Sequence, residues 1–314
     1  MRIKLAALAA VGLTVFAVGT GAAIKLALKA GAVKQPAVKV VWGDSGTGKP
    51  RAYQCGELSV TLSAHKGKYG MAPQIAVATP RQGKASLIGQ EAANEGASAT
   101  FFVMKLDPKS DGPAVIFTSF SWGAHCCTEI DILDPIGAGW ALVKTGSWDG
   151  DGLTETPRDI NGDGVPDIVL RDNAFLYTFD AYAFSWAPPL VLNVVGGKLS
   201  DVSASGRYRS LFADDMAGAK VQCLKHSNGA CAGYVADAAR IGQADAAWRV
   251  MLGAYQHNPE EMWRPKVCAA ATAGGACPKG KEQQFKDFPP ALAWFLANGG
   301  YITAAKAEAL AKAR

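Results

Sequence analysis

The segment Arg158-Asp-Ile-Asn-Gly-Asp-Gly-Val-Pro-Asp167 gathers oxygen-bearing side chains in a short, glycine-rich stretch. These side chains belong to Asp159, Asn161, Asp163 and Asp167. Calcium takes about six to eight oxygen ligands, and alternate residues of a tightly wound loop supply them. Gly164 allows the sharp turn that brings the Val165 carbonyl to the ion. We therefore expect a calcium-binding loop, and the alternative is an ordinary Asp-Gly and Asn-Gly turn that binds nothing.

The spacing of this loop also separates two families of calcium sites. An EF-hand carries a bidentate Glu at its twelfth position, where this chain has Leu170, so the loop is not an EF-hand. The D-x-N-x-D-G-x-x-D pattern instead resembles the calcium loops of FG-GAP and VCBS repeats, the blade units of integrin-α-like β-propellers. The resemblance implies a strand directly after the loop, at residues 168–170. It assigns the side-chain ligand role to Asp159, Asn161, Asp163 and Asp167, and the backbone role to Val165.

The resemblance rests on one copy of the loop. The Phe-Gly and Gly-Ala-Pro signatures of the family are missing, and no second copy follows at blade spacing, so we expect two or three blades of sheet rather than a complete propeller. A related pattern, with Asp149, Asp151 and Glu155, precedes the loop by twelve residues. We expect it to be a solvated hairpin tip, with a second or shared ion as the alternative.

Outward from the loop, residues 38–205 have the pattern of short strands. Runs of β-branched and aromatic residues at 58–62, 100–104, 115–118 and 168–170 are bounded by Gly, Pro, Asp and Asn. Turn signals at intervals near ten residues favour antiparallel sheets in a propeller-like or sandwich arrangement over a βαβ fold. We expect this region to be a mainly β, FG-GAP/VCBS-like calcium-binding domain.

Residues 206–314 are alanine-rich and are expected to be an α-helical region that contains cysteines. Between residues 234 and 256, apolar residues recur every three or four positions, which predicts one amphipathic helix. They are Ala238, Ile241, Ala244, Trp248, Met251 and Tyr255. A second helix is expected to begin at Pro289 and to stop at Gly299, and a third to begin at the N-cap Thr303.

The first 32 residues have the features of a leader. Arg2 and Lys4 precede an uncharged run over residues 5–24, and small-residue cleavage sites are available at 20–22 and 30–32, as in a secretory signal peptide. We therefore expect export to the periplasm or the cell exterior. The run is also just long enough to span a bilayer, so a membrane anchor over residues 5–24 is the alternative. Lysines that follow the run oppose export under the positive-inside rule.

The charge of the chain gives no basis for nucleic acid binding. The formal charge is +5, and four basic residues lie before residue 33, so cleavage there leaves about 5 − 4 = +1.

The seven cysteines suit a protein with disulfides from an oxidising compartment. Cys223 with Cys231, and Cys268 with Cys277, enclose short loops, so local pairing is expected, with crossed connectivities left open. Because neighbours on a strand face opposite ways, Cys126 and Cys127 are expected to bridge different partners, Cys55 being the best candidate for one. An odd number leaves at least one thiol over. The alternative for His125-Cys-Cys127 is a soft metal such as zinc or copper.

The remaining chemistry-bearing residues do not form an enzyme motif. His65, His125, His226 and His257 stand in no recognisable nucleophile motif. Trp122, Trp140, Trp148 and Trp186 are typical of core or sheet-face positions and keep carbohydrate binding open. We expect a non-enzymatic binding, adhesion or envelope-associated module for a protein or carbohydrate ligand. The alternative is a periplasmic or secreted hydrolase of an envelope polymer, with a site near His125 and the acidic loops.

Overall fold

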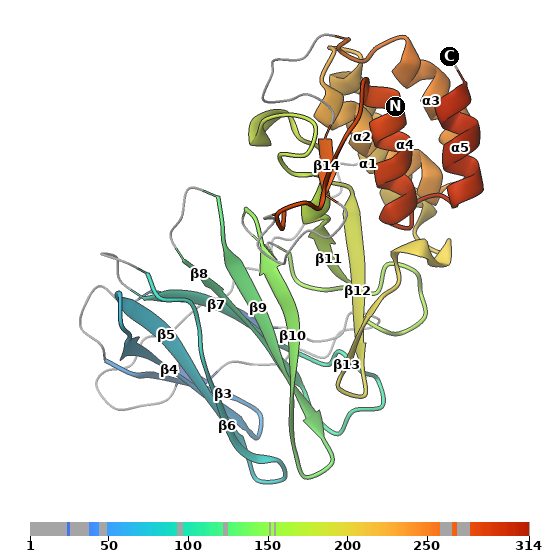
Figure 1. Ribbon diagram of the computed structural model, residues 1–314. Helices are drawn as coiled ribbons and strands as arrows, with labels where there is room; N and C mark the ends of the chain where they lie inside the picture. The colour runs from blue at the N-terminus through green and yellow to red at the C-terminus, as the bar shows by residue number, and fades with distance from the viewer. Residues whose placement is uncertain are drawn as a thin grey trace, which may run out of the picture.

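The computed structural model (Figure 1) describes residues 24–25, 38–43, 49–92, 97–121, 125–150, 152–153, 155–257, 266–268 and 277–313. Antiparallel sheets form the N-terminal part and helices form the C-terminal part, which confirms the predicted fold class. Most of the expected leader lies outside the described residues. Within the described residues, every helix is too short or too polar to cross a membrane.

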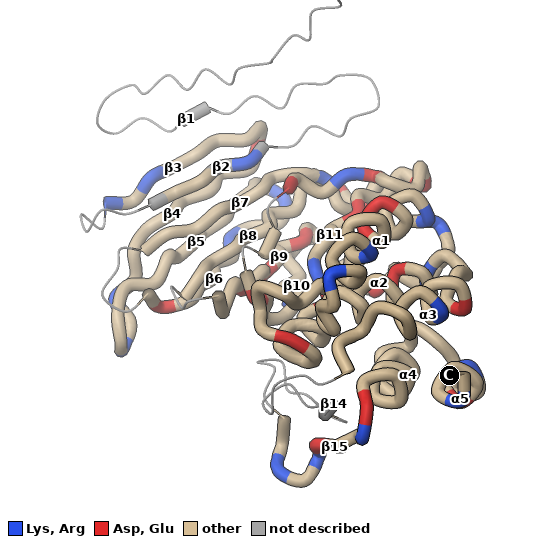
Figure 2. The backbone as a smooth tube through the Cα atoms, turned by 90° about the horizontal axis from the view of Figure 1, so that it is seen from above, with Lys and Arg blue, Asp and Glu red and all other residues tan. Residues whose placement is uncertain are grey.

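Two five-stranded sheets form adjacent layers (Figures 1 and 2). The first has the order β1-β3-β4-β5-β6, with β1 Ile24–Lys25, β3 Arg51–Cys55, β4 Leu58–Lys66, β5 Met71–Thr79 and β6 Gly83–Ile88. The second has the order β10-β9-β8-β7-β2, with β2 Val38–Gly43, β7 Ser98–Met104, β8 Ala114–Phe120, β9 Thr128–Ile136 and β10 Gly139–Trp148. Only β1 and β3 are parallel neighbours among these described strands. Strands were predicted at residues 58–62, 100–104 and 115–118, and β4, β7 and β8 contain them.

Alternation along the strands gives the second sheet two buried faces. Phe101, Val103 and Phe117 pack against the first sheet, in a core with Val60 and Ile75. Their neighbours in the chain face the opposite way, because successive side chains of a strand point to opposite faces. The second sheet is therefore the middle layer of the β part.

The third sheet covers this opposite face. It has the order β11-β12-β13, with β11 Ile168–Arg171, β12 Pro189–Val195 and β13 Lys198–Asp201. Ile168 and Val194 share a buried cluster with Phe102, Ile116 and Ile132 of the middle sheet. The expected strand after the acidic loop is β11, which begins directly at Ile168. Three stacked sheets agree with the predicted sandwich-like or propeller-like arrangement, and the described sheets do not close into a barrel.

Five helices follow the sheets in the described part of the chain (Figure 1). They are α1 Arg209–Cys223, α2 Asn228–Arg240, α3 Ala244–Leu252, α4 Phe288–Asn298 and α5 Ala304–Lys312. A short strand pair, β14 Lys266–Cys268 and β15 Glu282–Gln284, lies between α3 and α4. The 3-10 turns η1 Asn173–Phe175, η2 Tyr182–Phe184 and η3 Ser203–Ser205 lie in the loops before α1. Phe175 and Phe179 pack into the helical core, so the segment before β12 belongs to both parts.

The helix predictions hold with one correction. Helix α4 has prolines in its first turn, and Thr303 Oγ1 accepts the Lys306 amide as the N-cap of α5. The single helix predicted over residues 234–256 is wrong, because the chain forms α2 and α3 with a break between them. Gly242 has a φ of +79°, a left-handed conformation that ends a helix at little cost in glycine. The apolar stripe is buried in spite of the break.

The disulfides also need one correction. Cys223 pairs with Cys231 and Cys268 pairs with Cys277, as expected. Cys126 and Cys127 pair with each other and not with different partners. They lie in the bend before β9, so the alternation of side chains along a strand does not separate them. Cys55 is a buried free thiol in the core between the first two sheets, and burial raises its pKa to about 11.

Candidate functional site

The acidic loop is wound around its own carboxylates. Asp159 Oδ1 accepts the amides of Gly162 at 2.7 Å and Asp163 at 3.2 Å, and Asp159 Oδ2 accepts the amide of Gly164 at 2.8 Å. Asn161 Oδ1 accepts the Asp163 amide, Asp163 Oδ1 accepts the Val165 amide, and Asp167 Oδ2 accepts the Ile160 amide. Gly164 has a φ of +87°, which an L side chain rarely adopts. The loop is thus a tight turn in which side-chain oxygens face the backbone amides of the loop itself.

The same loop joins the third sheet to the helical region. Asp167 is 1% exposed, and its Oδ1 accepts hydrogen bonds from the Tyr208 hydroxyl at 2.7 Å and from Asn193 Nδ2 at 2.8 Å. The Tyr208 hydroxyl also accepts a bond from Asn161 Nδ2 at 2.8 Å. Tyr208 is the residue before α1, and burial together with Asp167 raises its pKa far above the usual range. The buried hydroxyl therefore connects two loop residues to the start of α1.

The residue types of the loop fit a calcium ion. Three carboxylates and an amide oxygen are hard ligands, and a carboxylate oxygen that accepts one N–H keeps a second lone pair. Two features of this structure compete with an ion: Arg207 Nη1 lies 3.1 Å from Asp163 Oδ2, and Asp167 is committed to Tyr208 and Asn193. Among the described residues, no group of three or more Asp, Glu, His or Cys side chains converges to hold a metal. Calcium at Asp159, Asn161, Asp163, Val165 and Asp167 stays a prediction.

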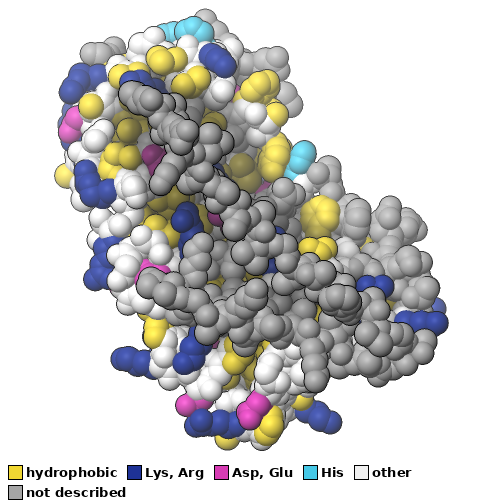
Figure 3. Space-filling view, turned by 180° about the vertical axis from the view of Figure 1, so that it is seen from behind, with side chains coloured by type: hydrophobic (Ala, Val, Ile, Leu, Met, Phe, Trp, Pro, Cys, Tyr) yellow, Lys and Arg dark blue, Asp and Glu magenta, His cyan; other side chains and the backbone are white. Residues whose placement is uncertain are grey.

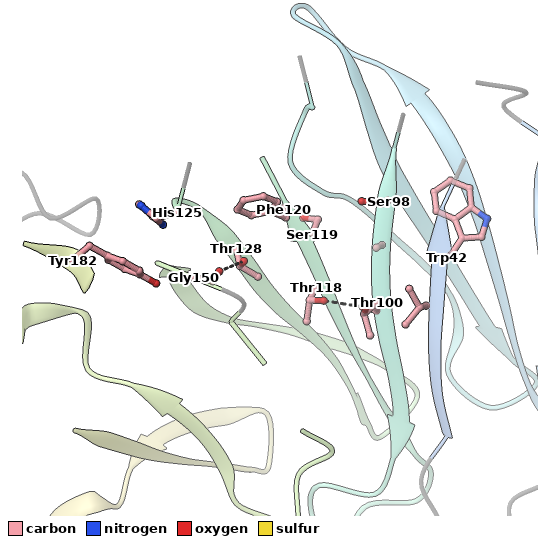
Figure 4. Close-up of a pocket in the computed structure, with 12 residues that line it drawn as sticks. Trp42, Ser98, Thr100, Thr118, Ser119, Phe120, His125, Thr128, Gly150 and Tyr182 are labelled. Carbon is pink, nitrogen blue, oxygen red and sulfur yellow. Dashed lines mark hydrogen bonds between the residues drawn. The ribbon is translucent and has the colours of Figure 1, made fainter. Parts of the chain in front are cut away.

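A first pocket, here called the threonine pocket, opens at the end of the middle sheet (Figure 4). Its volume is about 350 Å³. Thr100, Thr118 and Thr128 lie in a line across β7, β8 and β9, and His125 and Tyr182 lie at one end of this line. The rings of His125 and Tyr182 stack with centroids 4.1 Å apart. The pocket therefore combines hydroxyl groups with an aromatic end.

Two hydroxyl groups of the threonine pocket donate hydrogen bonds to the backbone. Thr118 Oγ1 donates to the Thr100 carbonyl at 3.1 Å, and Thr128 Oγ1 donates to the Gly150 carbonyl at 2.9 Å. A nucleophilic hydroxyl would instead donate to a general base. The hydroxyls of Thr118 and Thr128 donate to backbone carbonyls and not to His125.

A second pocket, here called the tryptophan pocket, adjoins the first, because Gly150 and Tyr182 line both. Its volume is about 420 Å³. It is lined by residues from β10, β11 and the segment before β12, namely Trp148, Asp149, Gly150, Gly152, Leu170, Arg171, Leu176, Tyr182, Ser185, Trp186 and Ala187. This pocket was not predicted, because its residues are far apart in the sequence and share no motif.

A buried acid lies behind the tryptophan pocket. Asp237 of α2 is fully buried, and its neighbours include Asp215 of α1 together with Arg171 and Arg240. Burial and then the negative charge of Asp215 raise the pKa of Asp237 to about 9, against the lowering effect of the two arginines. Asp237 is therefore protonated at neutral pH.

The structure brings together part of what the sequence singled out. Of the expected solvated hairpin tip, Glu155 is exposed, whereas Asp149 is half-buried and lines the tryptophan pocket. The neighbouring Gly150 amide donates to the His125 carbonyl at 2.7 Å. Asp151 and Trp122 lie outside the described residues. Trp140 packs on the core between the first two sheets, as expected of a sheet-face residue, while Trp148 and Trp186 line the pocket.

Basic side chains are scattered over the described part of one face. In the view from behind, the visible Lys and Arg side chains are scattered over both parts and do not form one patch (Figure 3).

The helical region is similar to a known family. Residues 212–300 match the family described as the sll0997 C-terminal domain. The chain is 32% identical over 270 residues to the uncharacterized protein y4bJ of Sinorhizobium fredii, which covers 83% of this chain and 42% of y4bJ. It is 29% identical over 261 residues to the probable thylakoid lumen protein sll0997 of Synechocystis, which covers 79% of this chain and 75% of that protein. This chain thus spans well under half of y4bJ and about three quarters of sll0997. No solved structure is significantly similar to it.

Proposed function

We propose that this protein is an exported, calcium-stabilised binding module whose ligand enters the adjoining threonine and tryptophan pockets. Export is supported by the leader-like N-terminal sequence, by the disulfides and by the name of the Synechocystis relative, a probable thylakoid lumen protein. The periplasm or the cell exterior is the location that we propose, with an anchor over residues 5–24 as the alternative.

The observation that carries the proposal is the course of β11. This strand begins at Ile168, one residue after the acidic loop closes at Asp167, and ends at Arg171 in the tryptophan pocket. An ion that fixes the loop would fix the start of a strand of four residues whose other end lines the pocket. Calcium would thus act on stability and on the shape of the pocket, and not on chemistry.

The lining of the pockets favours binding over hydrolysis. Aromatic rings and neutral hydroxyls line most of the threonine pocket, and the hydroxyls of Thr118 and Thr128 donate to backbone carbonyls. Two tryptophans line the tryptophan pocket. One observation favours the alternative: His125 lies in a pocket, next to the segment that contains Asp149. The alternative function is therefore hydrolysis of an envelope polymer with His125 as the general base.

The test of the calcium claim is a melting experiment on the full mature chain, in chelator and in millimolar calcium. An ion bound only by the folded state adds RT ln(1 + [L]/Kd), about 2.7 kcal/mol when calcium is a hundredfold above Kd. Asp163→Ala removes a ligand and also the pair with Arg207. Arg207→Gln removes the same pair and keeps the ligand, so it is the matched control. We expect calcium to stabilise the wild type and Arg207→Gln, and to have little effect on Asp163→Ala.

Two results would contradict the proposal. If calcium does not shift the wild-type transition, the loop is only a turn. If Asp163→Ala responds to calcium as strongly as Arg207→Gln, any ion binds elsewhere. A release assay on purified peptidoglycan separates the two functions: soluble fragments from the wild type but not from His125→Ala would establish the hydrolase.

A further inference from the structure

The indole of Trp186 lies where two helices each lack a side chain. A Cβ at Gly218 of α1 would lie 2.9 Å from Cη2 of Trp186, and a Cβ at Gly233 of α2 would lie 2.8 Å from its Cδ1. At Gly233 the same Cβ would also meet the Trp186 carbonyl oxygen at 2.5 Å. Glycine inside a helix is less favourable than alanine. Both helices therefore give up some stability at the positions that admit this ring.

One carboxylate holds both Trp186 and Arg171. Asp215 Oδ2 accepts the Trp186 indole N–H at 2.7 Å, and Asp215 Oδ1 accepts Nη1 of Arg171. Nη1 also donates to the Ala187 carbonyl at 3.1 Å. The Asp215 side chain is only 9% exposed, whereas the Arg171 side chain is 56% exposed. A buried acid thus orients an aromatic ring and a solvent-facing guanidinium in the same pocket.

The second tryptophan of the pocket is oriented in the same way. Trp148 Nε1 donates to Thr145 Oγ1 at 2.9 Å, so both indole N–H groups are satisfied within the protein. The rings of Trp148 and Trp186 therefore present apolar surface to a ligand and no donor. Arg171 and Asp149 line the same pocket and can hydrogen-bond to a ligand beside the rings.

We propose that the tryptophan pocket binds a neutral carbohydrate, with Trp186 as the ring on which a pyranose stacks; this inference rests on the proposed binding function and names its ligand class. A pyranose has an apolar face of C–H groups and a rim of hydroxyls that donate and accept. Apolar rings beside a guanidinium and a carboxylate match both features. A volume of about 420 Å³ is in the range of small-ligand sites.

The charges and donors of the pocket argue against other ligands. Arg171 and Asp149 are its only charged lining residues among those described, and the charge of Arg171 is compensated by Asp215. A phosphate, a sulfate or a uronate would find no uncompensated cation. An extended proline-rich peptide presents carbonyls that need donors beside the aromatic rings, and the indole N–H groups of Trp148 and Trp186 are already used.

The experiment is calorimetric titration of the full mature chain, in millimolar calcium, with the β-1,4-linked hexasaccharides of glucose and of N-acetylglucosamine. We expect at least one to bind with a Kd below about 1 mM. Trp186→Ala should weaken binding at least tenfold. Trp140→Ala is the matched control, because Trp140 is also half-buried but packs on the other core, and it should stay within twofold of the wild type. Arg171→Gln changes an exposed side chain and should weaken binding severalfold. It is the second test variant if Trp186→Ala does not fold.

Three results would overturn the inference. They are the absence of binding by both hexasaccharides, equal losses in Trp186→Ala and Trp140→Ala, and binding of a proline-rich decapeptide in place of the sugars. Because the calcium response is measured separately, a chain that melts higher in calcium but binds neither sugar refutes the carbohydrate and leaves the proposed function standing. A chain without a calcium response refutes the proposed function.

Discussion

Tyr208→Phe isolates the contact that holds the acidic loop to the helical region. The substitution removes one oxygen atom and keeps the ring, which is 1% exposed and packs with Phe212 and Ile241. Two hydrogen bonds are lost, from the hydroxyl to Asp167 and from Asn161 to the hydroxyl. The change in stability should therefore report the polar contact and not the hydrophobic packing.

The size of the stability change follows from the hydrogen-bond partners that Asp167 keeps. A hydrogen bond to a charged group contributes about 1.5–3 kcal/mol. Asp167 keeps its bonds to Asn193 and to the Ile160 amide, so no bare buried carboxylate is left. We expect a loss of about 2 kcal/mol in the free energy of unfolding. Unfolding entropy is about 2.1 cal/mol/K per residue, so for a chain of 314 residues this corresponds to a fall of roughly 3 °C in melting temperature.

The assay is differential scanning calorimetry in chelator, which keeps calcium out of the comparison. Tyr234→Phe is the matched control, because Tyr234 is 5% exposed and its hydroxyl makes no hydrogen bond to a described residue. If the free energies of unfolding of Tyr208→Phe and Tyr234→Phe lie within about 0.5 kcal/mol of each other, the Tyr208 hydroxyl does not hold the junction. The loop would then have to be connected to α1 by packing alone.

Three further predictions concern titration and thiols. Asp237 has a pKa of about 9 in the folded chain and an ordinary value when unfolded, so its contribution to stability is complete near pH 4 and is lost as the pH rises toward 9. Asp237→Asn should therefore flatten the fall in melting temperature between pH 5 and pH 8, and an unchanged slope would contradict the raised pKa. Replacing Cys223 and Cys231 by alanine should cost about 2–3 kcal/mol by denaturant titration, because the disulfide closes a short loop. Alkylation without reductant should modify Cys55 only after unfolding, since the thiol is buried; modification of three or more cysteines would contradict the disulfides.

The elements that the sequence predicted are those determined by nearby residues. The strands at 58–62 and 100–104 follow from local pattern, and the N-cap at Thr303 is a bond between Thr303 and Lys306. The local disulfides were found in the same way. The break at Gly242 was missed because the apolar period runs through it and the buried face is continuous. The pairing of Cys126 with Cys127 was missed because a strand was assumed where the chain bends.

The two candidate sites also differ in how local their residues are in the sequence. The acidic loop is local, so its ligand pattern can be read over nine residues. Its connection to the helices could not be predicted, because Tyr208 lies 41 residues beyond Asp167. The tryptophan pocket has no local signature at all. Its two tryptophans and Arg171 come from β10, β11 and the segment before β12, and its orienting carboxylate, Asp215, lies 44 residues beyond Arg171.

Arg171 connects these two kinds of site. It stands at the end of the strand that the acidic loop begins, and its guanidinium is held by the acid that also holds Trp186. A change in the loop that shifts β11 along its axis would move Arg171 relative to Asp215, whereas Trp186 would stay between Gly218 and Gly233. If calcium orders the loop, its removal should therefore weaken sugar binding through Arg171, and Arg171→Gln should make the remaining affinity insensitive to calcium. Titration of both chains in chelator and in calcium measures this coupling, and an equal calcium effect on the two would show that the loop and the pocket act independently.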